Sequence, residues 1–261
     1  MKKYFAIIIS VLALVACSNI SEDDRLILVE NREVKGEMAV LVEDYTGQKC
    51  TNCPSATRLL NDVRATFGEA KVIPVAIHSG GFGYWGNAAN IGLMTELGEY
   101  YWNKNGFTAS TPQPSAIFNR RTTSSDTDKW SGIIYNELSL ATKIVMEGSA
   151  AYDADSRTVT ISITHQSNED IAANLQLWLT ESNIVAMQID NGVTNREYVH
   201  NHVLRAAING NDGEPLTVTN DKTTTVRTYT IPTDYVAENC DIVAFFYNAT
   251  GVLNVIDVPV K

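Results

Sequence analysis

The chain has 261 residues, a formal net charge of −10 and four cysteines. A hydrophobic share of 44% and a charged share of 19% are typical of a folded globular protein and exclude wholesale disorder. The acidic balance argues against nucleic-acid binding, which needs a basic surface, and four cysteines are too few for a disulfide-dense scaffold. The length predicts one or two domains.

The N-terminus has the pattern of a bacterial export signal. Lys2 and Lys3 precede an apolar run over 4–16, which is shorter than the roughly 20 residues that cross a bilayer. The run ends in Leu14-Val15-Ala16-Cys17, which resembles the lipobox of bacterial lipoproteins. The resemblance implies a signal peptide over 1–16, cleavage before Cys17 and lipid on its thiol. A simple signal peptide with an incidental cysteine is the alternative.

Residues 17–35 are expected to form a polar, acidic tether. Its cluster Ser21-Glu22-Asp23-Asp24 resembles the signal that sends some Bacteroidetes lipoproteins to the outer face of the outer membrane. A solvated tail kept extended by its charge is an equal alternative. We therefore expect an outer-membrane lipoprotein of the cell envelope, on the periplasmic or the surface face, held to the membrane through lipid on Cys17.

A strand, a Cys-x-x-Cys motif and a helix follow in that order. The apolar, β-rich run 38–45 predicts a buried parallel strand, and apolar spacings of three and four over 56–68 predict a helix. Pro54 suits the first helical turn. Cys50 and Cys53 therefore stand at a helix N-terminus, where free N–H groups and the helix dipole stabilise a thiolate. We expect Cys50 to be the more exposed attacking thiol, with a lowered pKa, and Cys53 to be the resolving thiol.

This arrangement resembles the thioredoxin fold. The resemblance implies that Asp44 is a buried carboxylate that moves protons at the second cysteine. It also implies that Pro114, or failing that Pro112, is a cis-proline facing the thiols. A second strand over 71–78 follows the helix, as a parallel strand–helix–strand unit requires. The residue before the motif is Lys49, where thioredoxins usually have a tryptophan.

His78 ends the second predicted strand, and the carboxyl ends of parallel strands commonly line a site. We expect it near Cys50, either tuning the thiol and shuttling a proton or bonded to a loop carbonyl. A helical insertion is expected over 79–107, with a Gly-rich aromatic loop over 79–90 and a helix over 91–103. The aromatic rings are interpreted as a cap on the sheet or as a docking surface beside the thiols.

The second half of the chain changes to a period of two residues after a helix around 129–141. About seven strands, with a first hairpin turning at 153–156, predict an all-β sandwich of immunoglobulin-like type over 148–261. The predicted fold class is thus an α/β thioredoxin-like domain with a helical insertion over 36–147, followed by this sandwich. On a strand, His200 and His202 would share a face, but no clear third metal ligand accompanies them. Cys240 is expected to be a small buried residue.

Two segments narrow the resemblance. Val40-Leu41-Val42-Glu43-Asp44-Tyr45-Thr46-Gly47 leading into Cys50-x-x-Cys53-Pro54 is similar to the Omp28-related lipoproteins of Bacteroidetes. Tyr198-Val199-His200-Asn201-His202-Val203-Leu204-Arg205 is similar to the same family. The resemblance implies an outer-membrane lipoprotein with a thioredoxin-like N-terminal domain and adds little about mechanism.

Two functions from different classes follow. In the first, a lipid-anchored thiol–disulfide oxidoreductase acts on client proteins or peptides: Cys50 attacks the client disulfide, Cys53 resolves the mixed disulfide and Pro114 aligns the client backbone. In the second, a surface lipoprotein binds a protein or glycan, and the Cys-x-x-Cys motif is a structural disulfide on a scaffold. Neither function calls for a cofactor, a metal or nucleic acid.

Overall fold

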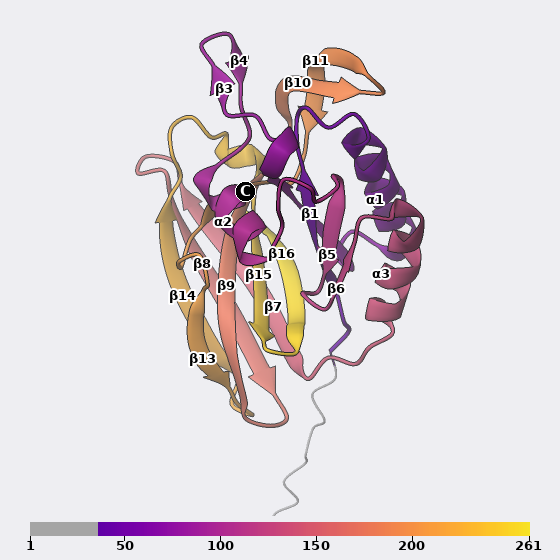
Figure 1. Cartoon of the computed structure of the whole chain (residues 1–261). Coiled ribbons are helices and arrows are strands. Elements are labelled where there is room, and N and C mark those ends of the chain that lie inside the picture. The colour runs from indigo at the N-terminus through magenta and orange to yellow at the C-terminus, as the bar shows by residue number, and fades with distance from the viewer. Residues whose placement is uncertain (1–35) are drawn as a thin grey trace, which may run out of the picture. The chain divides into compact units, whose positions relative to one another are not determined.

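A nine-stranded sheet runs through the part of the chain that the computed structural model describes, residues 36–261 (Figure 1). The predicted signal peptide over 1–16, the lipid site at Cys17 and the tether over 17–35 lie outside the described residues. Along the main path the strands follow the order β16 (Gly251–Pro259), β15 (Cys240–Asn248), β9 (Ile171–Glu181), β12 (Val203–Ala207), β2 (Val72–His78), β1 (Val40–Thr46), β5 (Ser115–Phe118) and β6 (Thr122–Ser124).

The centre of the sheet is parallel and its flanks are antiparallel. Strand β1 pairs in parallel with β2, and β2 pairs in parallel with β12, whereas β5 and β9 begin the antiparallel flanks. The ninth strand, β13 (Glu214–Val218), pairs with β9 beyond the end of β12. Strands from both halves of the chain therefore meet in one sheet at the β2–β12 junction.

A second sheet of three strands packs against the C-terminal part of the first. It has the order β14 (Thr223–Thr230), β8 (Thr158–Ser167) and β7 (Ile144–Asp153). Alternate residues of β9 and β15, such as Leu177 and Phe246, join the apolar core between the two sheets. Their neighbours in sequence, such as Trp178 and Phe245, join the core on the opposite face. This alternation follows from the period of two in a strand, and it buries β9 and β15 on both faces.

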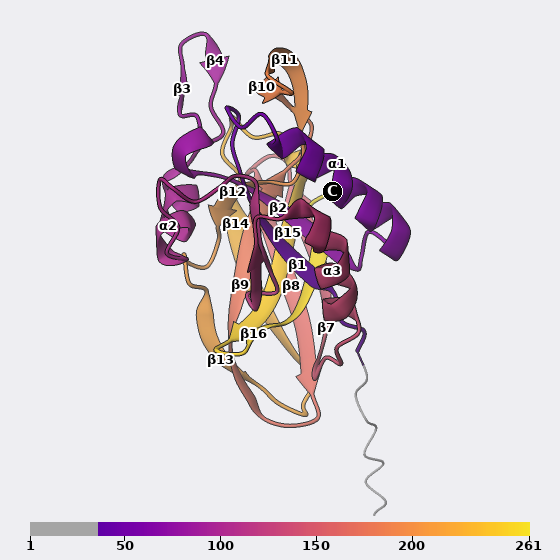
Figure 2. The ribbon, with the colours of Figure 1, turned by 45° about the vertical axis from the view of Figure 1, so that its right-hand side comes forward.

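Three helices cover the N-terminal part of the large sheet. The apolar sides of α1 (Cys53–Phe67) and α3 (Trp130–Leu138) pack on one face of β1 and β5, and α2 (Glu96–Lys104) packs on the other (Figure 2). Three 3-10 turns complete the helical elements of the described chain: η2 (Gly80–Phe82), η3 (Thr127–Lys129) and η4 (Ala237–Asn239).

Two short ribbons project together from one end of the molecule in both ribbon views (Figures 1 and 2). The first consists of β3 (Gly86–Asn87) and β4 (Asn90–Ile91), and the second of β10 (Ile184–Asp190) and β11 (Val193–His200). The Nη1 atom of Arg196 lies 3.3 Å from Asn90 Oδ1 and joins them. Segments about 100 residues apart in sequence therefore form one pole of the structure.

The predicted fold class, a thioredoxin-like α/β domain with a helical insertion followed by an immunoglobulin-like sandwich, is wrong. Among the described residues 48% lie in strands and 19% in helices, and the largest sheet draws strands from both predicted domains. The physical reason is that β12 satisfies the open edge of β2, where the Ala76 N–H donates to the His202 carbonyl oxygen at 2.8 Å. The boundary expected at 147/148 falls inside β7, and the division into domains over 36–147 and 148–261 stays a prediction.

Many local predictions are confirmed. The helix expected over 56–68 is α1, the strand expected over 71–78 is β2, and the hairpin turning at 153–156 is β7–β8. The helix expected over 91–103 begins only at Glu96, because the preceding residues form the β3–β4 ribbon. No helix within residues 36–261 is both long and apolar enough to cross a membrane.

Candidate functional site

Cys50 and Cys53 form a disulfide at the start of α1. Cys53 is the first helical residue and its N–H donates to Cys50 Sγ at 3.1 Å. Pro54 follows in the first turn, where a missing N–H leaves no hydrogen bond unmade. The helix N-terminus and one of its N–H groups thus face the Cys50 sulfur, an environment that favours negative charge when the pair is reduced.

Both sulfur-bearing residues are buried. Cys50 and Cys53 are each only 2% exposed, so the prediction that Cys50 is the more exposed of the two is wrong. Two segments from elsewhere in the chain lie over the motif, and they explain this burial.

The first segment is the turn around Phe82 together with Gln113. The Gln113 side chain donates to the carbonyl oxygens of Thr46 and Ser79 at 3.0 and 2.9 Å and accepts from the Phe82 N–H at 3.1 Å. The Gln113 carbonyl oxygen lies 3.4 Å from Cys50 Sγ, and the Gln113–Pro114 peptide bond is cis. Pro114 is therefore placed beside the disulfide, as the resemblance implied.

The second segment is the β10–β11 hairpin. Gln188 Nε2 donates to the carbonyl oxygens of Cys50 at 2.9 Å and Gly47 at 3.2 Å. The Ile189 N–H donates to the Gln48 carbonyl oxygen at 2.9 Å, and the Asn191 N–H donates to the Thr51 carbonyl oxygen at 3.2 Å. Sequence reasoning missed this cover, because the turn signal Asn191-Gly192 predicts a hairpin but not where the hairpin docks.

A cavity of about 30 Å³ lies behind the disulfide, large enough for one or two waters. Its lining includes Asp44, Cys53, His78, Tyr198 and His200. Asp44 Oδ1 is buried without a hydrogen-bond partner, and burial raises the pKa of Asp44 to about 7. Asp44 therefore has the position that the resemblance implied, in the same cavity as the second cysteine.

Three histidines line this cavity, His78, His200 and His202, and the first two contact each other. The His78 and His200 rings pack edge to face with centroids 5.3 Å apart, and His78 Nδ1 and His200 Nε2 have no hydrogen-bond partner. Burial holds the pKa of His78 well below its usual range and lowers that of His200 to about 4. His78, expected near Cys50, thus lines the cavity of Cys53.

His202 does not join His200 on one strand face. It follows the end of β11 with a φ of 54°, and its Nε2 lies 3.0 Å from Arg64 Nη1. Within residues 36–261 no group of three or more His, Cys, Asp or Glu side chains is arranged to hold a metal ion. Cys240 is a free, buried cysteine as expected, and burial raises the pKa of its thiol to about 12.

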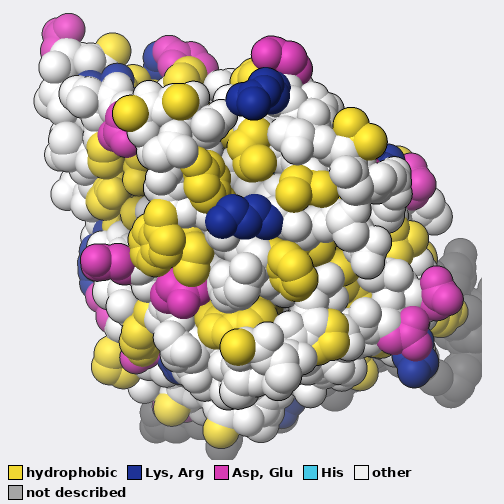
Figure 3. All heavy atoms as spheres, turned by 45° about the horizontal axis from the view of Figure 1, so that its top comes forward, with side chains coloured by type: hydrophobic (Ala, Val, Ile, Leu, Met, Phe, Trp, Pro, Cys, Tyr) yellow, Lys and Arg dark blue, Asp and Glu magenta, His cyan; other side chains and the backbone are white. Residues whose placement is uncertain are grey.

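Large apolar side chains are exposed around the two ribbons. They are Phe82, Trp85, Ile91, Val185, Val193 and Val199. Trp85 is 59% exposed, so this ring of the aromatic loop does not cap the sheet. Figure 3, with this end turned forward, shows hydrophobic side chains scattered among polar and charged ones. The pole that carries the buried disulfide therefore also carries exposed apolar side chains.

Comparisons with known proteins agree with this β-rich fold. The model of a family described as outer membrane protein Omp28 matches residues 101–261, a segment that does not include the disulfide. HBP35 of Porphyromonas gingivalis is similar in structure, with a TM-score of 0.69 and 13% identity over 85% of this chain and 75% of that one. A protein of Agrobacterium tumefaciens gives a TM-score of 0.51 at 15% identity, over 87% and 97% of the two chains. At these identities the likeness shows the fold alone. No curated protein matches the chain.

Proposed function

The chain belongs to the Omp28 outer membrane protein family, and from this premise we propose that its Cys50–Cys53 pair exchanges disulfides with client proteins of the cell envelope. Attachment of the protein to the outer membrane through lipid on Cys17 is part of the same proposal. The observation that carries the proposal is the unpaired, buried Asp44 carboxyl in a water-sized cavity beside Cys53. A purely structural disulfide does not need such a group, which destabilises the fold whenever it ionises.

The chemistry requires two attacks at sulfur. In the reduced protein, the Cys50 thiolate attacks a client disulfide, forms a mixed disulfide and displaces one client thiolate. The Cys53 thiol then loses its proton to Asp44 across the cavity, and its sulfur attacks Cys50 and releases the second client thiolate. The client gains two electrons and the protein returns to the Cys50–Cys53 disulfide. The same steps in reverse oxidise a client dithiol.

Exchange also requires access to the sulfurs. Because both cysteines are 2% exposed, the proposed cycle includes a movement of the β10–β11 hairpin away from the motif. Hydrogen bonds of Gln188, Ile189 and Asn191 attach the hairpin to the motif, and the movement requires that these bonds break. Its exposed face carries Val185 and Val199 directly opposite each other.

The second candidate is a binding module in which the disulfide is structural. The burial of both cysteines favours it, as does the position of the matched family segment outside the motif. In that case the exposed apolar side chains of the two ribbons would be the part of the protein that contacts a partner.

The reduction potential of the pair separates the two candidates. The full chain, purified in detergent, is equilibrated in glutathione and dithiothreitol buffers, trapped with a thiol reagent and weighed by mass spectrometry. A value between about −270 and −120 mV lies in the range of working oxidoreductases and supports exchange. A value below about −300 mV indicates a structural disulfide and contradicts it.

A trapping variant gives a direct test. Cys53→Ser removes the resolving thiol, so mixed disulfides between Cys50 and clients are expected to accumulate in cells and to disappear on reduction. Cys240→Ser is the matched control, because it removes a buried thiol far from the motif in sequence. Absence of any mixed disulfide in Cys53→Ser, with normal folding, would overturn the proposal.

A further inference from the structure

Arg120 has an unusual backbone conformation. It follows Asn119 in the tight turn between β5 and β6, and both residues have positive φ angles, 54° and 47°. The Arg121 N–H donates to the Phe118 carbonyl oxygen at 2.9 Å and closes the turn. Such turns favour Asn followed by Gly, and a long side chain at the second position costs about 1 kcal/mol or more. An arginine at a position that favours glycine indicates that contacts of its side chain outweigh this backbone cost.

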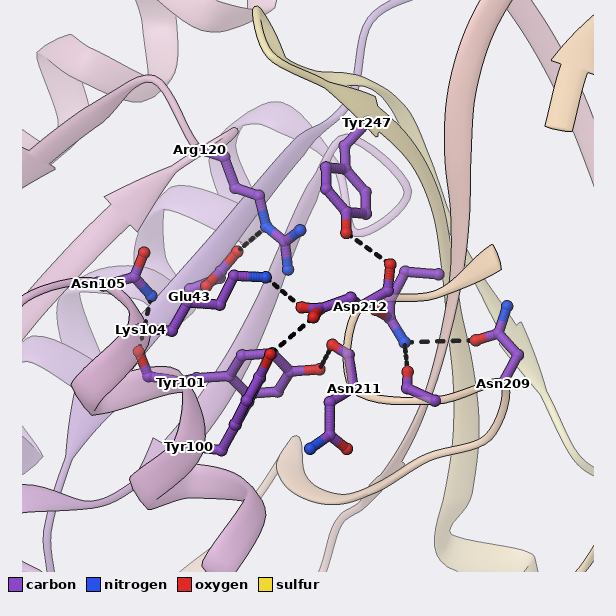
Figure 4. Close-up of polar contacts among 12 residues, drawn as sticks. Glu43, Tyr100, Tyr101, Lys104, Asn105, Arg120, Asn209, Asn211, Asp212 and Tyr247 are labelled. Carbon is purple, nitrogen blue, oxygen red and sulfur yellow. Dashed lines mark hydrogen bonds and ion pairs between the residues drawn. The ribbon is translucent and has the colours of Figure 1, made fainter. Parts of the chain in front are cut away.

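The guanidinium of Arg120 is held from two sides. Its Nε donates to Glu43 Oε1 at 2.8 Å, and Glu43 is buried and also accepts from the Tyr45 hydroxyl at 3.0 Å. The guanidinium carbon lies 4.2 Å from the centre of the Tyr247 ring and 4.9 Å from that of Phe245. Figure 4 shows the group between Glu43 and Tyr247. Its orientation is therefore determined before any ligand arrives.

The two Nη atoms of Arg120 have no hydrogen-bond partner among residues 36–261. An arginine can donate five hydrogen bonds, and here only the Nε donor is used. Arg121 differs, because all three of its nitrogens donate, to the Thr250 carbonyl oxygen, the Glu137 carboxylate and the Val252 carbonyl oxygen. Arg120 thus presents a planar pair of free donors.

These donors belong to a pocket of about 250 Å³. Its lining includes Lys104, Ile117, Arg120, Arg121 and Tyr247. Three of these side chains are basic and none is acidic. The carboxylates that pair with them, Glu43, Glu137 and Asp212, do not line the pocket. Each of the three cations is therefore already paired with one carboxylate, and the free guanidinium donors of the pocket are the two Nη atoms of Arg120.

We propose that this pocket binds a small organic oxyanion, with its carboxylate or phosphate group on the two Nη atoms of Arg120 and the Nζ of Lys104. A planar guanidinium fork matches two oxygens of such a group, and the Lys104 ammonium, which also contacts Asp212, has further N–H donors to offer. Tyr247 and Ile117 supply apolar walls for the rest of the ligand. The site is independent of the disulfide, since Glu43 and Asp44 point to opposite faces of β1.

Calorimetric titration of the full chain with inorganic phosphate and with benzoate tests the proposal, at constant chloride concentration. Saturable binding of one or both probes with a stoichiometry of one is expected. Tighter binding of benzoate identifies an organic carboxylate, and tighter binding of phosphate identifies a phosphate group. If neither probe saturates, the proposal is wrong.

Variants locate the binding. Arg120→Lys keeps the charge beside Glu43 but removes the fork, and we expect it to weaken binding by about tenfold. Lys104→Gln is expected to weaken binding by about threefold to fivefold. Lys129→Gln is the matched control, because it removes the same charge from an exposed side chain outside the pocket. Unchanged binding in Arg120→Lys, or equal weakening in Lys129→Gln and Lys104→Gln, would show that the probes do not occupy this pocket. Thermal unfolding of each variant verifies that it is folded.

Discussion

Two neighbouring carboxylates on β1 have opposite environments. Glu43 is buried on the α2 face and fully engaged, with Arg120 on one oxygen and Tyr45 on the other. Asp44 is buried on the α1 face, where its Oδ1 has no hydrogen-bond partner, and it lines a cavity together with His78 and His200, whose pKa values are lowered by burial. Both side chains are almost fully buried, so burial alone does not distinguish their roles.

The difference lies in what each group does with its charge. Glu43 holds a guanidinium in place, and losing either partner leaves an uncompensated buried charge. Asp44 has no cation to hold and instead exchanges its proton near neutral pH, since its pKa is raised to about 7. The first carboxylate positions Arg120, and in the proposed cycle the second accepts the proton of Cys53.

The largest change in stability is expected from replacing Glu43, the carboxylate that is paired with Arg120. Glu43→Gln leaves Arg120 without its counter-ion, and we expect the free energy of unfolding to fall by about 3–5 kcal/mol. Urea denaturation at pH 7 measures it. Glu169→Gln, which breaks the exposed Lys143–Glu169 pair, is the control and should change little. A small loss in Glu43→Gln would show that Glu43 does not stabilise Arg120.

Replacing Asp44, the carboxylate without a partner, is expected to raise stability rather than lower it. The pKa of Asp44 is about 7 in the folded state and 3.8 ordinarily, so stability is lost as the pH rises from about 4 to about 7. Asp44→Asn removes that penalty and is expected to stabilise the protein at pH 8 by up to about 4 kcal/mol, with no gain below pH 4. Urea denaturation at the two pH values measures the gain.

Histidine titration does not obscure this difference. His78 and His200 have lowered pKa values, so they cost stability as the pH falls below about 6.5. Both remain in Asp44→Asn, and their contribution cancels between variant and parent. Equal stability of the two proteins at pH 8 would mean that Asp44 has a partner or access to solvent. If Asp44 accepts the Cys53 proton, the variant should also resolve mixed disulfides about 100-fold more slowly.

A smaller effect is expected from the cover over the disulfide. Gln188→Ala removes two hydrogen bonds to the carbonyl oxygens of Gly47 and Cys50, each contributing about 1 kcal/mol. Local opening of the hairpin should become easier, and reduction of the disulfide by a phosphine should be about tenfold faster. Gln166→Ala, which also removes a donor to a backbone carbonyl, is the control. An unchanged rate would show that the hairpin does not limit access.

The smallest effect is expected from the exposed ion pair that joins α1 to the same hairpin. Asp190→Asn breaks the contact of Arg58 with Asp190 at 3.0 Å and should change stability by less than about 1 kcal/mol. Its effect on the reduction rate should be correspondingly small and should vanish at high salt. A rate increase as large as that of Gln188→Ala would shift the anchoring role to the ion pair.

Part of the candidate site is predictable from sequence because it is local. Cys50, Cys53 and Pro54 lie within five residues at the start of α1, and Asp44 lies in the strand just before them, so short spacing brings these residues together. Pro114 was expected from the resemblance to thioredoxins and His78 from its position at a strand end. In the structure Pro114 follows the residue that contacts Cys50, and His78 lines the cavity of Cys53. The pairing of His78 with His200 was not predictable, because it joins strands whose contact no periodicity encodes.

The sequence by itself determined the helices, most strands and the turn residues, since these depend on propensities and on periods of two or 3.6 residues. Tertiary structure alone decided that the two halves share one sheet, that the β10–β11 hairpin covers the disulfide, and that Arg120 reaches Glu43. Each of these contacts spans about 70 to 140 residues. Such contacts are selected by free edges, buried charges and packing over the whole fold, which a local pattern does not contain.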